Sequence, residues 1–496
     1  MNAVTPMLDT EPGFSHAKIR SIIFGIMLAM LLASLDQTIV ATVLPTIGAE
    51  LGDFANLSWV VTAYLLASTA VTPLYGKLSD IHGRGVVMTA AVVLFTLGSI
   101  ACALAPGMLT LVLARGFQGL GGGGLIAVAQ TIVADVVPPR QRGHYQAMIA
   151  GVFATSSIAG PVLGGLIAQH LHWSVIFWIN LPLGAGALFM IRRIMNSLPR
   201  HERAHRLDLP GALLLFIAAT SLLVALSWGG VLYRWASLQV LSLLGLSALG
   251  SCAFVWRMRT APEPFLPLDM LLDRVVAAGT GAAFFIYGII IALTITTPLY
   301  FETAWHLSTA ASGFALIPQM AGTVGGTLIS GQAMARLRWY KLPALVFLSV
   351  SVLSLTAIAI LPEIPRAVQL GLFAVIAFGM GTVLPLSTVA IQNAVPLHRL
   401  GTVTGTANFF RALGGALFVA LLGAVLLGAL GANGVGEAMG GLSELALHAD
   451  PARVQHAFHL TFGVAAAVAF CGLVCVIVME QRPLRASVRL DPVEAV

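Results

Sequence analysis

Asp36 is the one ionisable residue in an apolar run from residue 22 to residue 44. A run of that length can cross the hydrocarbon core of a bilayer, which takes about 20 apolar residues. A charge at that depth costs at least about 2.5 to 3.5 kcal/mol on insertion scales, and such residues mark ion or proton pathways. Removal from water favours the neutral form of a carboxyl group, so Asp36 is predicted to exchange a proton. The alternative is a structural carboxyl that is hydrogen-bonded to Gln37, Thr38 or a neighbouring helix.

Arg115 is a second charge inside an apolar run, at residues 108–134. It cannot lose its proton, so its burial requires a partner or water. Gln118 and Gly119 follow at i+3 and i+4 and share a helix face with it. A changing contact between this guanidinium and a carboxyl group can link protonation to shape. A fixed structural ion pair is the alternative.

The composition is that of a polytopic membrane protein. Of the 496 residues, 58% are hydrophobic and 9% are charged, whereas soluble domains carry roughly 25% charged residues. The first apolar block is expected to be a retained helix, because it is too long for a signal peptide and lacks a small-residue cleavage site. The basic residues lie in short loops between spans, a distribution that reports membrane topology and argues against a nucleic-acid partner.

No catalytic constellation emerges, so we expect neither an enzyme nor a cofactor nor a metal site. The glycine run at residues 119–124 lacks the Lys-Ser/Thr of a phosphate-binding loop. No paired carboxylates, metal-ligand cluster or nucleophile with a base is evident. The four cysteines fall within apolar blocks, where cysteine packs as a small hydrophobe.

Fourteen membrane helices are predicted, and the basic residues orient them. If both termini are cytoplasmic, twenty-one Lys and Arg residues fall on the inner side and only Arg234, Arg366 and Arg453 on the outer side. By the positive-inside rule, this split places both termini in the cytoplasm of a multi-pass protein, which we assign to the bacterial plasma (inner) membrane. The predicted spans are 22–44, 57–76, 86–105, 108–134, 145–168, 174–195, 209–228, 235–256, 275–299, 308–332, 342–361, 367–391, 401–428 and 457–479.

An internal repeat divides the chain into two halves. VPPRQRG at residues 137–143 returns as VPLHRLG at residues 395–401, an offset of 258, and the Gly-basic segments that begin at Gly76 and Gly331 are 255 apart. Two related halves around a central site are typical of transporters. At offset 258 the position of Arg115 is occupied by Phe373, so the buried ionic residues are concentrated in the first half.

The repeat predicts five parts. These are a cytoplasmic segment 1–21, a six-helix bundle 22–195, a linker with two extra helices 196–274, a second six-helix bundle 275–479 and a cytoplasmic tail 480–496. The second bundle contains an outer loop at residues 429–456. Two roles are open for this loop, a cap over an exit path and a simple tether.

Several segments resemble the fourteen-helix drug:proton antiporter branch of the major facilitator superfamily. LDQTIVATVLPTI (35–47), GKLSDIHGRG (76–85), LARGFQGLGGG (113–123), GPVLGG (160–165) and WSVIFWINLPLG (173–184) are similar to its signatures. Ile81 and Gly85 depart from the pattern, because the family often carries basic residues there. The resemblance implies an all-α major facilitator fold of two six-helix bundles plus two inserted helices.

The resemblance also implies roles for charged residues of the first half. It associates Arg115 with proton coupling, together with Asp36. It implies a conformational latch near the inner helix ends that holds the two halves in the outward-facing state, and ordinary loop charge is the alternative. The predicted latch residues are Gly76, Asp80, Arg84, Asp135 and Arg142.

Gly160, Pro161, Gly164 and Gly165 can be interpreted from their chemistry alone. Glycines at i and i+4 let helices approach closely, while Pro161 removes a backbone donor and permits a kink. We therefore expect a pliant, tightly packed helix at the interface between the halves, with packing alone or direct gating as its role.

A substrate cavity is predicted from polar and adaptable apolar residues. Arg411 either lines it or pairs structurally, and Glu302 is either an outer ligand or a solvated helix-end charge. Most aromatic residues in such helices face lipid or packing partners, which is the alternative for the aromatic members. The predicted set is Gln118, Phe284, Phe285, Tyr287, Glu302, Gln319, Met380 and Arg411.

Together these features predict a proton-coupled antiporter that exports amphipathic drugs or toxic small molecules by alternating access. Its partners are a small amphipathic substrate, protons and the lipid bilayer, and it is expected to work as a monomer. A narrow exporter of an endogenous lipid, siderophore or metabolite shares every motif, and a non-transporting membrane sensor is a further alternative. Asp36, Arg115 and Arg411 sum to a formal charge of +1, which gives no support for a cation-selective pocket.

Overall fold

The computed structural model of the chain is helical throughout its described part. It describes residues 16–53, 56–195, 207–230, 232–266, 268–361, 364–430 and 450–485. Parts of several predicted segments lie outside these residues. They are residues 1–15 of the cytoplasmic segment, 196–206 of the linker, 431–449 of the outer loop and 486–496 of the tail. All regular elements of the described residues are helices, apart from one isolated bridge between Gly229 and Tyr233.

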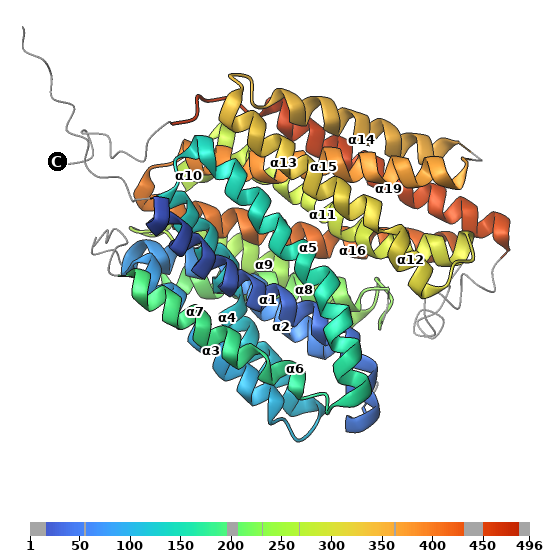
Figure 1. Cartoon of the computed structure of the whole chain (residues 1–496), viewed down its shortest axis with the longest axis horizontal. Helices are drawn as coiled ribbons and strands as arrows, with labels where there is room; N and C mark the ends of the chain where they lie inside the picture. Colours follow the sequence, from blue (N-terminus) through green and yellow to red (C-terminus); the bar gives the residue numbers. More distant parts are fainter. Residues whose placement is uncertain are drawn as a thin grey trace, which may run out of the picture.

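Seven helices form a bundle from the first part of the chain (Figure 1). They are α1 (His16–Leu51), α2 (Trp59–His82), α3 (Arg84–Ala103), α4 (Met108–Val136), α5 (Pro139–His170), α6 (Val175–Trp178) and α7 (Asn180–Met195). α6 and α7 together form one predicted span. Pro182 lies in the first turn of α7, where it cannot donate to the carbonyl of Trp178, and the helix is interrupted at Ile179.

The last part of the chain forms a second bundle. Its elements are α11 (Arg274–Ala304), α12 (Thr309–Ala315), α13 (Ile317–Arg336), α14 (Leu342–Ile360), α15 (Arg366–Ala394), the short 3₁₀ helix η1 (Leu397–Arg399), α16 (Leu400–Leu430) and α19 (Pro451–Val478). α12 and α13 share one predicted span, which is broken at Leu316 just before Pro318. Each bundle has its own apolar core, one built from residues between 22 and 191 and the other from residues between 275 and 484.

Three helices come from the segment between the bundles, namely α8 (Leu209–Trp228), α9 (Leu238–Thr260) and the short α10 (Leu268–Leu271). α8 and α9 pack on each other, and α8 also contacts α2 and α16, which belong to different bundles. A shared apolar cluster includes Ala70, Leu215, Phe254 and Phe409. The inserted pair therefore lies along the line where the two bundles meet.

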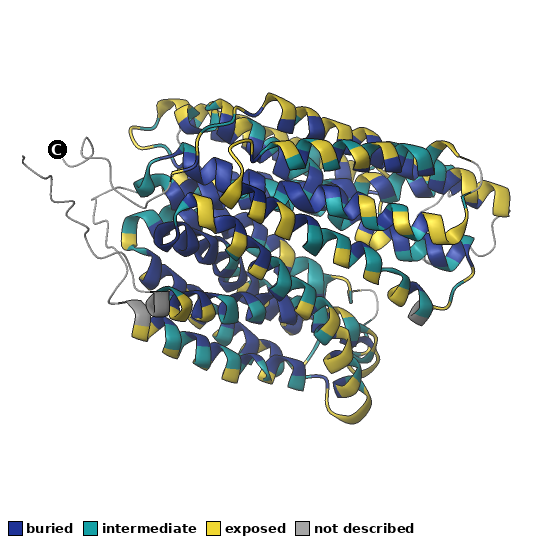
Figure 2. Cartoon of the chain, turned by 45° about the horizontal axis from the view of Figure 1, so that its top comes forward, coloured by how far each residue is buried: buried dark blue, intermediate teal, exposed yellow. Residues whose placement is uncertain are grey.

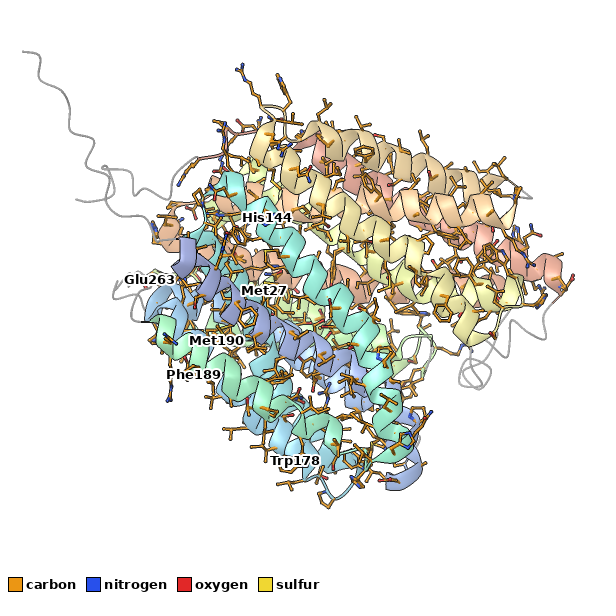
Figure 3. All side chains as sticks on the ribbon, viewed as in Figure 1. Met27, His144, Trp178, Phe189, Met190 and Glu263 are labelled. Atoms are coloured by element: carbon orange, nitrogen blue, oxygen red, sulfur yellow. The ribbon has the colours of Figure 1, made fainter. Side chains whose placement is uncertain are left out.

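The helices are long and apolar enough for a membrane. Twelve of the described helical segments meet that criterion by length and hydropathy, while α2 and α13 are of similar length but less apolar. With these two, the fourteen predicted spans are confirmed, with ends displaced by a few residues. Large apolar side chains such as Leu238 and Leu109 are exposed, as expected of a lipid-facing surface. Figure 2 shows exposed residues along the outer faces of the helices, and Figure 3 labels Phe189, another exposed apolar residue, on α7.

The two bundles converge at one end of the molecule and diverge toward the other (Figure 1). At the converging end, here called the closed end, Gly76 of α2 meets Gly401 of α16, and Gly143 of α5 meets Gly331 of α13. A Cβ atom on any of these four glycines would overlap backbone atoms of its partner. The predicted repeat pairs Gly76 with Gly331 and Gly143 with Gly401, so it relates these two contacts to each other.

The closed end is therefore expected to open when one glycine contact is filled. We predict that Gly143→Val lengthens the distance between spin labels at Gln141 and Leu337, which lie on the exposed ends of α5 and α13. Double electron–electron resonance on a background without exposed native cysteines measures it. Gly151→Val is the matched control, because a Cβ there meets nothing within 4 Å. An unchanged distance in Gly143→Val contradicts the packing argument.

Candidate functional site

Asp36 lies at the centre of a polar cluster inside the first bundle. Its Oδ2 atom accepts a hydrogen bond from Arg115 Nη1 at 2.7 Å, and its Oδ1 atom accepts from Gln118 Nε2 at 3.0 Å and from Asn180 Nδ2 at 2.8 Å. Asp36 is 2% exposed and Arg115 is not exposed at all. Every contact is a donor to the carboxylate, as an ionised aspartate requires.

The guanidinium of Arg115 is held from several sides. Its Nε atom donates to the carbonyl of Val60 at 3.0 Å, and Nη1 also donates to Gln118 Oε1 at 2.6 Å. Its Cζ atom lies 4.4 Å from the ring centre of Tyr64 and 5.7 Å from that of Phe177. Hydrogen bonds and aromatic faces thus replace water around this buried cation.

Four helices supply the cluster. Asp36 comes from α1, Arg115 and Gln118 from α4, and Asn180 from the start of α7, where it also donates to Ser99 Oγ of α3 at 2.9 Å. Asn180 and Ser99 were not predicted as site residues. Asn180 lies in the WSVIFWINLPLG segment. The sequence signal for it is a polar residue in an apolar span, two positions before Pro182.

The glycine-rich part of α5 packs on α1 beside this cluster. A Cβ on Gly160 would overlap Thr38, and one on Gly164 would lie 3.1 Å from the carbonyl oxygen of Ile39. Thr38 Oγ1 donates to the carbonyl of Ser156 at 2.9 Å. This stretch therefore packs within the first bundle, while other parts of α5 contact α13 and α15 of the second bundle, so the helix itself lies between the halves as predicted.

Two further residues of this stretch have other surroundings. A Cβ on Gly165 meets nothing within 4 Å, and the side chain of Pro161 is exposed on an unbroken α5. The contact of α5 with the other bundle comes earlier in the helix, at Gly143.

The predicted latch residues meet at the closed end. Asp80, near the end of α2, accepts hydrogen bonds from the backbone of Gly401 at 2.9 Å, the backbone of Thr402 at 2.6 Å and the Thr402 hydroxyl at 2.6 Å. These amides belong to the first turn of α16, where an anion is favoured by unpaired N–H groups and by the helix dipole. The carboxylate thereby joins one bundle to the other.

Arg84 connects this cap to the rest of the first bundle. Its Nη1 atom lies 2.5 Å from Asp80 and its Nε atom lies 2.8 Å from Asp135, with all three side chains about as buried as the core. Arg142 instead donates to the carbonyls of Ala134 and Val137 at the end of α4. The structure therefore brings Gly76, Asp80, Arg84 and Asp135 to the closed end, with Arg142 as a cap of α4.

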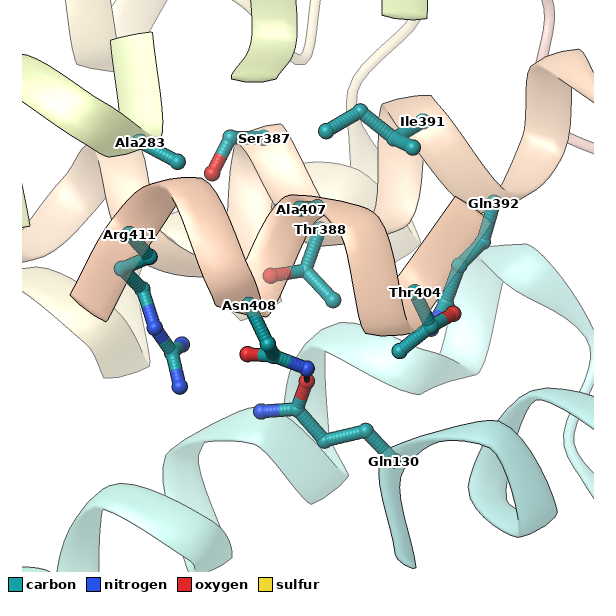
Figure 4. A pocket seen from close by; sticks show the side chains of 10 residues that line it. All are labelled: Gln130, Ala283, Ser387, Thr388, Ile391, Gln392, Thr404, Ala407, Asn408 and Arg411. Carbon is teal, nitrogen blue, oxygen red and sulfur yellow. Dashed lines mark hydrogen bonds between the residues drawn. The ribbon is translucent and has the colours of Figure 1, made fainter. Parts of the chain in front are cut away.

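A small pocket lies between the bundles, next to the closed end (Figure 4). Asn408 of α16 donates to Gln130 Oε1 of α4 at 2.9 Å, a buried hydrogen bond that joins the two bundles. None of the residues lining the pocket is acidic. They are Gln130, Ala283, Ser387, Thr388, Ile391, Gln392, Thr404, Ala407, Asn408 and Arg411.

The predicted cavity residues are distributed over several places. Arg411 lines the pocket, and its Cζ atom lies 4.8 Å from the ring centre of Tyr287. Phe284 and Phe285 pack on Phe418, with ring centres 5.3 and 5.8 Å away. The aromatic packing alternative therefore describes the surroundings of these two phenylalanines.

The other predicted cavity residues lie away from this pocket. Met380 is buried in the apolar core of the second bundle, and Gln118 belongs to the cluster around Asp36. Glu302 accepts a hydrogen bond from Ser312 at 2.8 Å near the end of α11. Gln319 is buried with no hydrogen-bond partner for its Oε1 atom. Gln130 and Asn408 were not predicted, although Asn408 precedes Arg411 by three residues and shares its helix face.

Comparison with known sequences gives consistent matches. Residues 26–419 match the Major Facilitator Superfamily. Multidrug resistance protein 3 of Bacillus subtilis (strain 168) is 34% identical over 421 residues, which cover 84% of this chain and 81% of that protein. The multidrug transporter protein MdtP of the same organism is 32% identical over 82% of this chain and 75% of its own length.

Solved structures share the fold at lower identity. The human organic anion transporter MFSD10 superposes with a TM-score of 0.62 at 17% identity, covering 92% of this chain and 99% of its own. A bacterial homologue of the iron transporter ferroportin, in an outward-facing state, gives a TM-score of 0.64 at 14% identity, covering 92% of this chain and 98% of its own.

The ion pair in the first bundle generates a stability prediction. Arg115→Gln leaves Asp36 buried without its counter-charge, a loss that typically costs about 3 to 5 kcal/mol. We expect a clear fall in the thermal unfolding temperature of the purified protein. The double variant Asp36→Asn with Arg115→Gln removes both charges and is expected to recover part of it. If the double variant unfolds at a lower temperature than Arg115→Gln, the pair is not the source of the effect.

The cap on α16 generates a conformational prediction. Asp80→Asn retains one acceptor oxygen but turns an NH2 group toward backbone donors, so the closed end is expected to open more often. The rate at which a thiol reagent modifies a cysteine placed at Ser79, which is buried at this end, is expected to rise.

The matched control is Asp269→Asn. Asp269 also faces an arginine at this end, but its ion pair with Arg399 is exposed and such pairs contribute little. The hydrogen bond from Arg399 holds the pKa of Asp269 below its ordinary value, so this control pair stays charged across the neutral range. Equal modification rates in the two variants contradict a specific role for Asp80.

Proposed function

Because the chain belongs to the Major Facilitator Superfamily, we propose that it is a proton-coupled antiporter that exports amphipathic small molecules by alternating access. The protein is a transporter and not an enzyme. The observation that carries the proposal is the enclosed pair of Asp36 and Arg115. An ionisable carboxyl group at membrane depth, paired with a cation that cannot lose its proton, is the arrangement expected of a proton-coupling site.

Protonation of Asp36 changes what its neighbours can do. The neutral carboxyl loses its attraction for Arg115 and offers fewer acceptor sites to Gln118 and Asn180. The guanidinium then requires another acceptor, which favours a different arrangement of α1, α4 and α7. The proton therefore selects between two arrangements of the first bundle.

The contacts of α1 and α5 suggest how this change reaches the closed end. Thr38, two residues after Asp36, packs on Gly160 of α5, and α5 carries Gly143 against Gly331 of the other bundle. A shift of α1 is thus expected to act on α5 and on the closure. Asp80 of α2, which accepts hydrogen bonds from the first turn of α16, supplies the electrostatic part of the same closure.

The positive-inside rule supports the orientation of this state. The basic side chains at the closed end include Arg84, Arg142, Arg336, Arg399 and Arg482, so we assign this end to the cytoplasm. The conformation then faces outward, with both termini in the cytoplasm of the cell that makes the protein. Export follows if a proton from outside binds Asp36 here and the substrate binds after the closed end opens.

The names of the relatives support a broad range of substrates, since one is a multidrug resistance protein and another a multidrug transporter. A narrow exporter of an endogenous lipid, siderophore or metabolite would use the same machinery. A panel of substrates distinguishes the two. We expect the protein to work as a monomer, because each chain contains both bundles and the pocket between them.

Transport in proteoliposomes tests the proposal. We expect a pH gradient to drive accumulation of at least one amphipathic probe from a panel of cationic, neutral and anionic compounds. Asp36→Asn keeps the shape of the side chain but cannot exchange a proton, so gradient-driven accumulation is expected to disappear. Exchange of labelled for unlabelled probe without a gradient is expected to persist.

Asp269→Asn is the matched control, because it removes an exposed carboxylate outside the membrane helices. It is expected to accumulate the probe like the unmodified protein. Proton coupling through Asp36 is excluded if Asp36→Asn accumulates probe as well as the unmodified protein does. A protein that binds probes but moves none of them under a pH gradient is instead a sensor.

A further inference from the structure

We propose that Arg411 binds an acidic group of the substrate, so that the transported compounds are amphipathic organic anions, with a carboxylate as the simplest case. The inference rests on the proposed function in one respect, since it takes the space between the two bundles as the substrate path. It adds the chemical class of the substrate. The evidence is the position, the charge balance and the surroundings of Arg411.

The position of Arg411 is at membrane depth, between the bundles. It lies ten residues beyond Gly401 on α16, which corresponds to about 15 Å along a helix. Thr404, Asn408 and Arg411 follow one another at i, i+4 and i+7 and share the face of α16 that lines the pocket. In Figure 4 the guanidinium extends from α16 toward the side where Gln130 of the other bundle lies.

The charge of Arg411 is not balanced by the protein. Among the described residues, no carboxylate lies within ion-pair distance of it, whereas Arg84 pairs with two carboxylates and Arg115 with one. Asp36 and Arg115 balance each other inside the first bundle. The pocket between the bundles therefore carries one formal positive charge, which comes from Arg411 alone among its lining residues.

The surroundings of Arg411 fix the orientation of its guanidinium. The ring of Tyr287 covers one face of the guanidinium, with 4.8 Å between Cζ and the ring centre. A planar guanidinium held in this way presents its N–H groups in a fork that fits a carboxylate with two parallel hydrogen bonds. A cationic ligand would instead meet a like charge there.

A second observation indicates that the pocket is incomplete without a ligand. Gln392 is 3% exposed, and its Nε2 atom donates to Thr404, but its Oε1 atom has no hydrogen-bond partner. A buried acceptor without a donor is unusual in folded proteins. A ligand that carries both an acidic group and a hydrogen-bond donor, such as an N-acyl or N-sulfonyl amino acid, can satisfy Arg411 and Gln392 together.

Equilibrium binding of a matched probe series tests the inference. The probes are the dansyl amide of 6-aminohexanoic acid, its methyl ester, and a dansyl amide of the same length that ends in a trimethylammonium group. Binding is measured by equilibrium dialysis against the protein in lipid nanodiscs, with empty nanodiscs as the blank. We expect the carboxylate to bind about tenfold more tightly than the ester, as charge-assisted hydrogen bonds imply, and the trimethylammonium probe to bind most weakly.

Substitutions of Arg411 locate the preference. Arg411→Gln is expected to remove the preference for the carboxylate while leaving binding of the methyl ester intact, which also reports that the variant is folded. Arg411→Lys keeps the charge without the fork and is expected to retain part of the preference. Arg366→Gln is the matched control, because Arg366 also lies over an aromatic ring, that of Trp305 at 5.7 Å, but outside the pocket.

The outcomes separate this inference from the proposed function. Equal or weaker binding of the carboxylate than of the ester, no saturable binding of the carboxylate, or a preference that survives in Arg411→Gln overturns the inference. None of these measurements uses a pH gradient. Gradient-driven transport of a cationic probe without a carboxylate preference therefore rejects only the anion site, whereas a carboxylate preference without any gradient-driven transport rejects only proton coupling.

Discussion

A buried charge inside a membrane bundle needs a partner, and this requirement organises the first half of the chain. Asp36 and Arg115 neutralise each other, and satisfying their remaining hydrogen bonds draws in Gln118, Asn180 and Ser99 from neighbouring helices. The four transmembrane helices α1, α3, α4 and α7 are thereby held in fixed positions relative to one another. In the proposed mechanism the same pair is the part of the bundle that responds to a proton, because the attraction between the two groups exists only while the carboxyl group is ionised.

The closed end uses the same physics at the junction between the bundles. Glycines allow two pairs of helices to approach until their backbones touch, and this shape is repeated on both sides of the molecule. Charge reinforces the contact between α2 and α16, because Asp80 caps the start of α16. The repeat-related contact between α5 and α13 lacks this reinforcement, because the loop that follows α13 has no residue that corresponds to Asp80. Closure thus combines a symmetric shape with an asymmetric electrostatic contact.

The second half shows what the repeat keeps and what it changes. Phe373 occupies the position that corresponds to Arg115, and it is buried among Tyr300, Phe301 and Phe462. The fold tolerates either a charged cluster or an aromatic one at this place, because both fill the centre of a bundle. Arg411, a charged residue of the second half, faces the space between the bundles, where the charge of a ligand can balance it.

The membrane class, the fourteen helices and their approximate ends were predictable from the sequence alone, because the length and apolar character of a span are local properties. The sequence also identified Asp36 and Arg115, since a charge inside an apolar run is conspicuous without any structure, while the resemblance of GKLSDIHGRG to a known signature pointed to Asp80 and Arg84, with Asp135 as their partner. The breaks at Ile179 and Leu316 were missed, although Pro182 and Pro318 were visible in the sequence. The partners of these charges, and the packing of Gly160 within its own bundle, became known only from the arrangement of the helices in three dimensions. Those partners come from helices that are far apart in the sequence. Their contacts depend on how the helices pack in three dimensions, which the local sequence pattern does not predict.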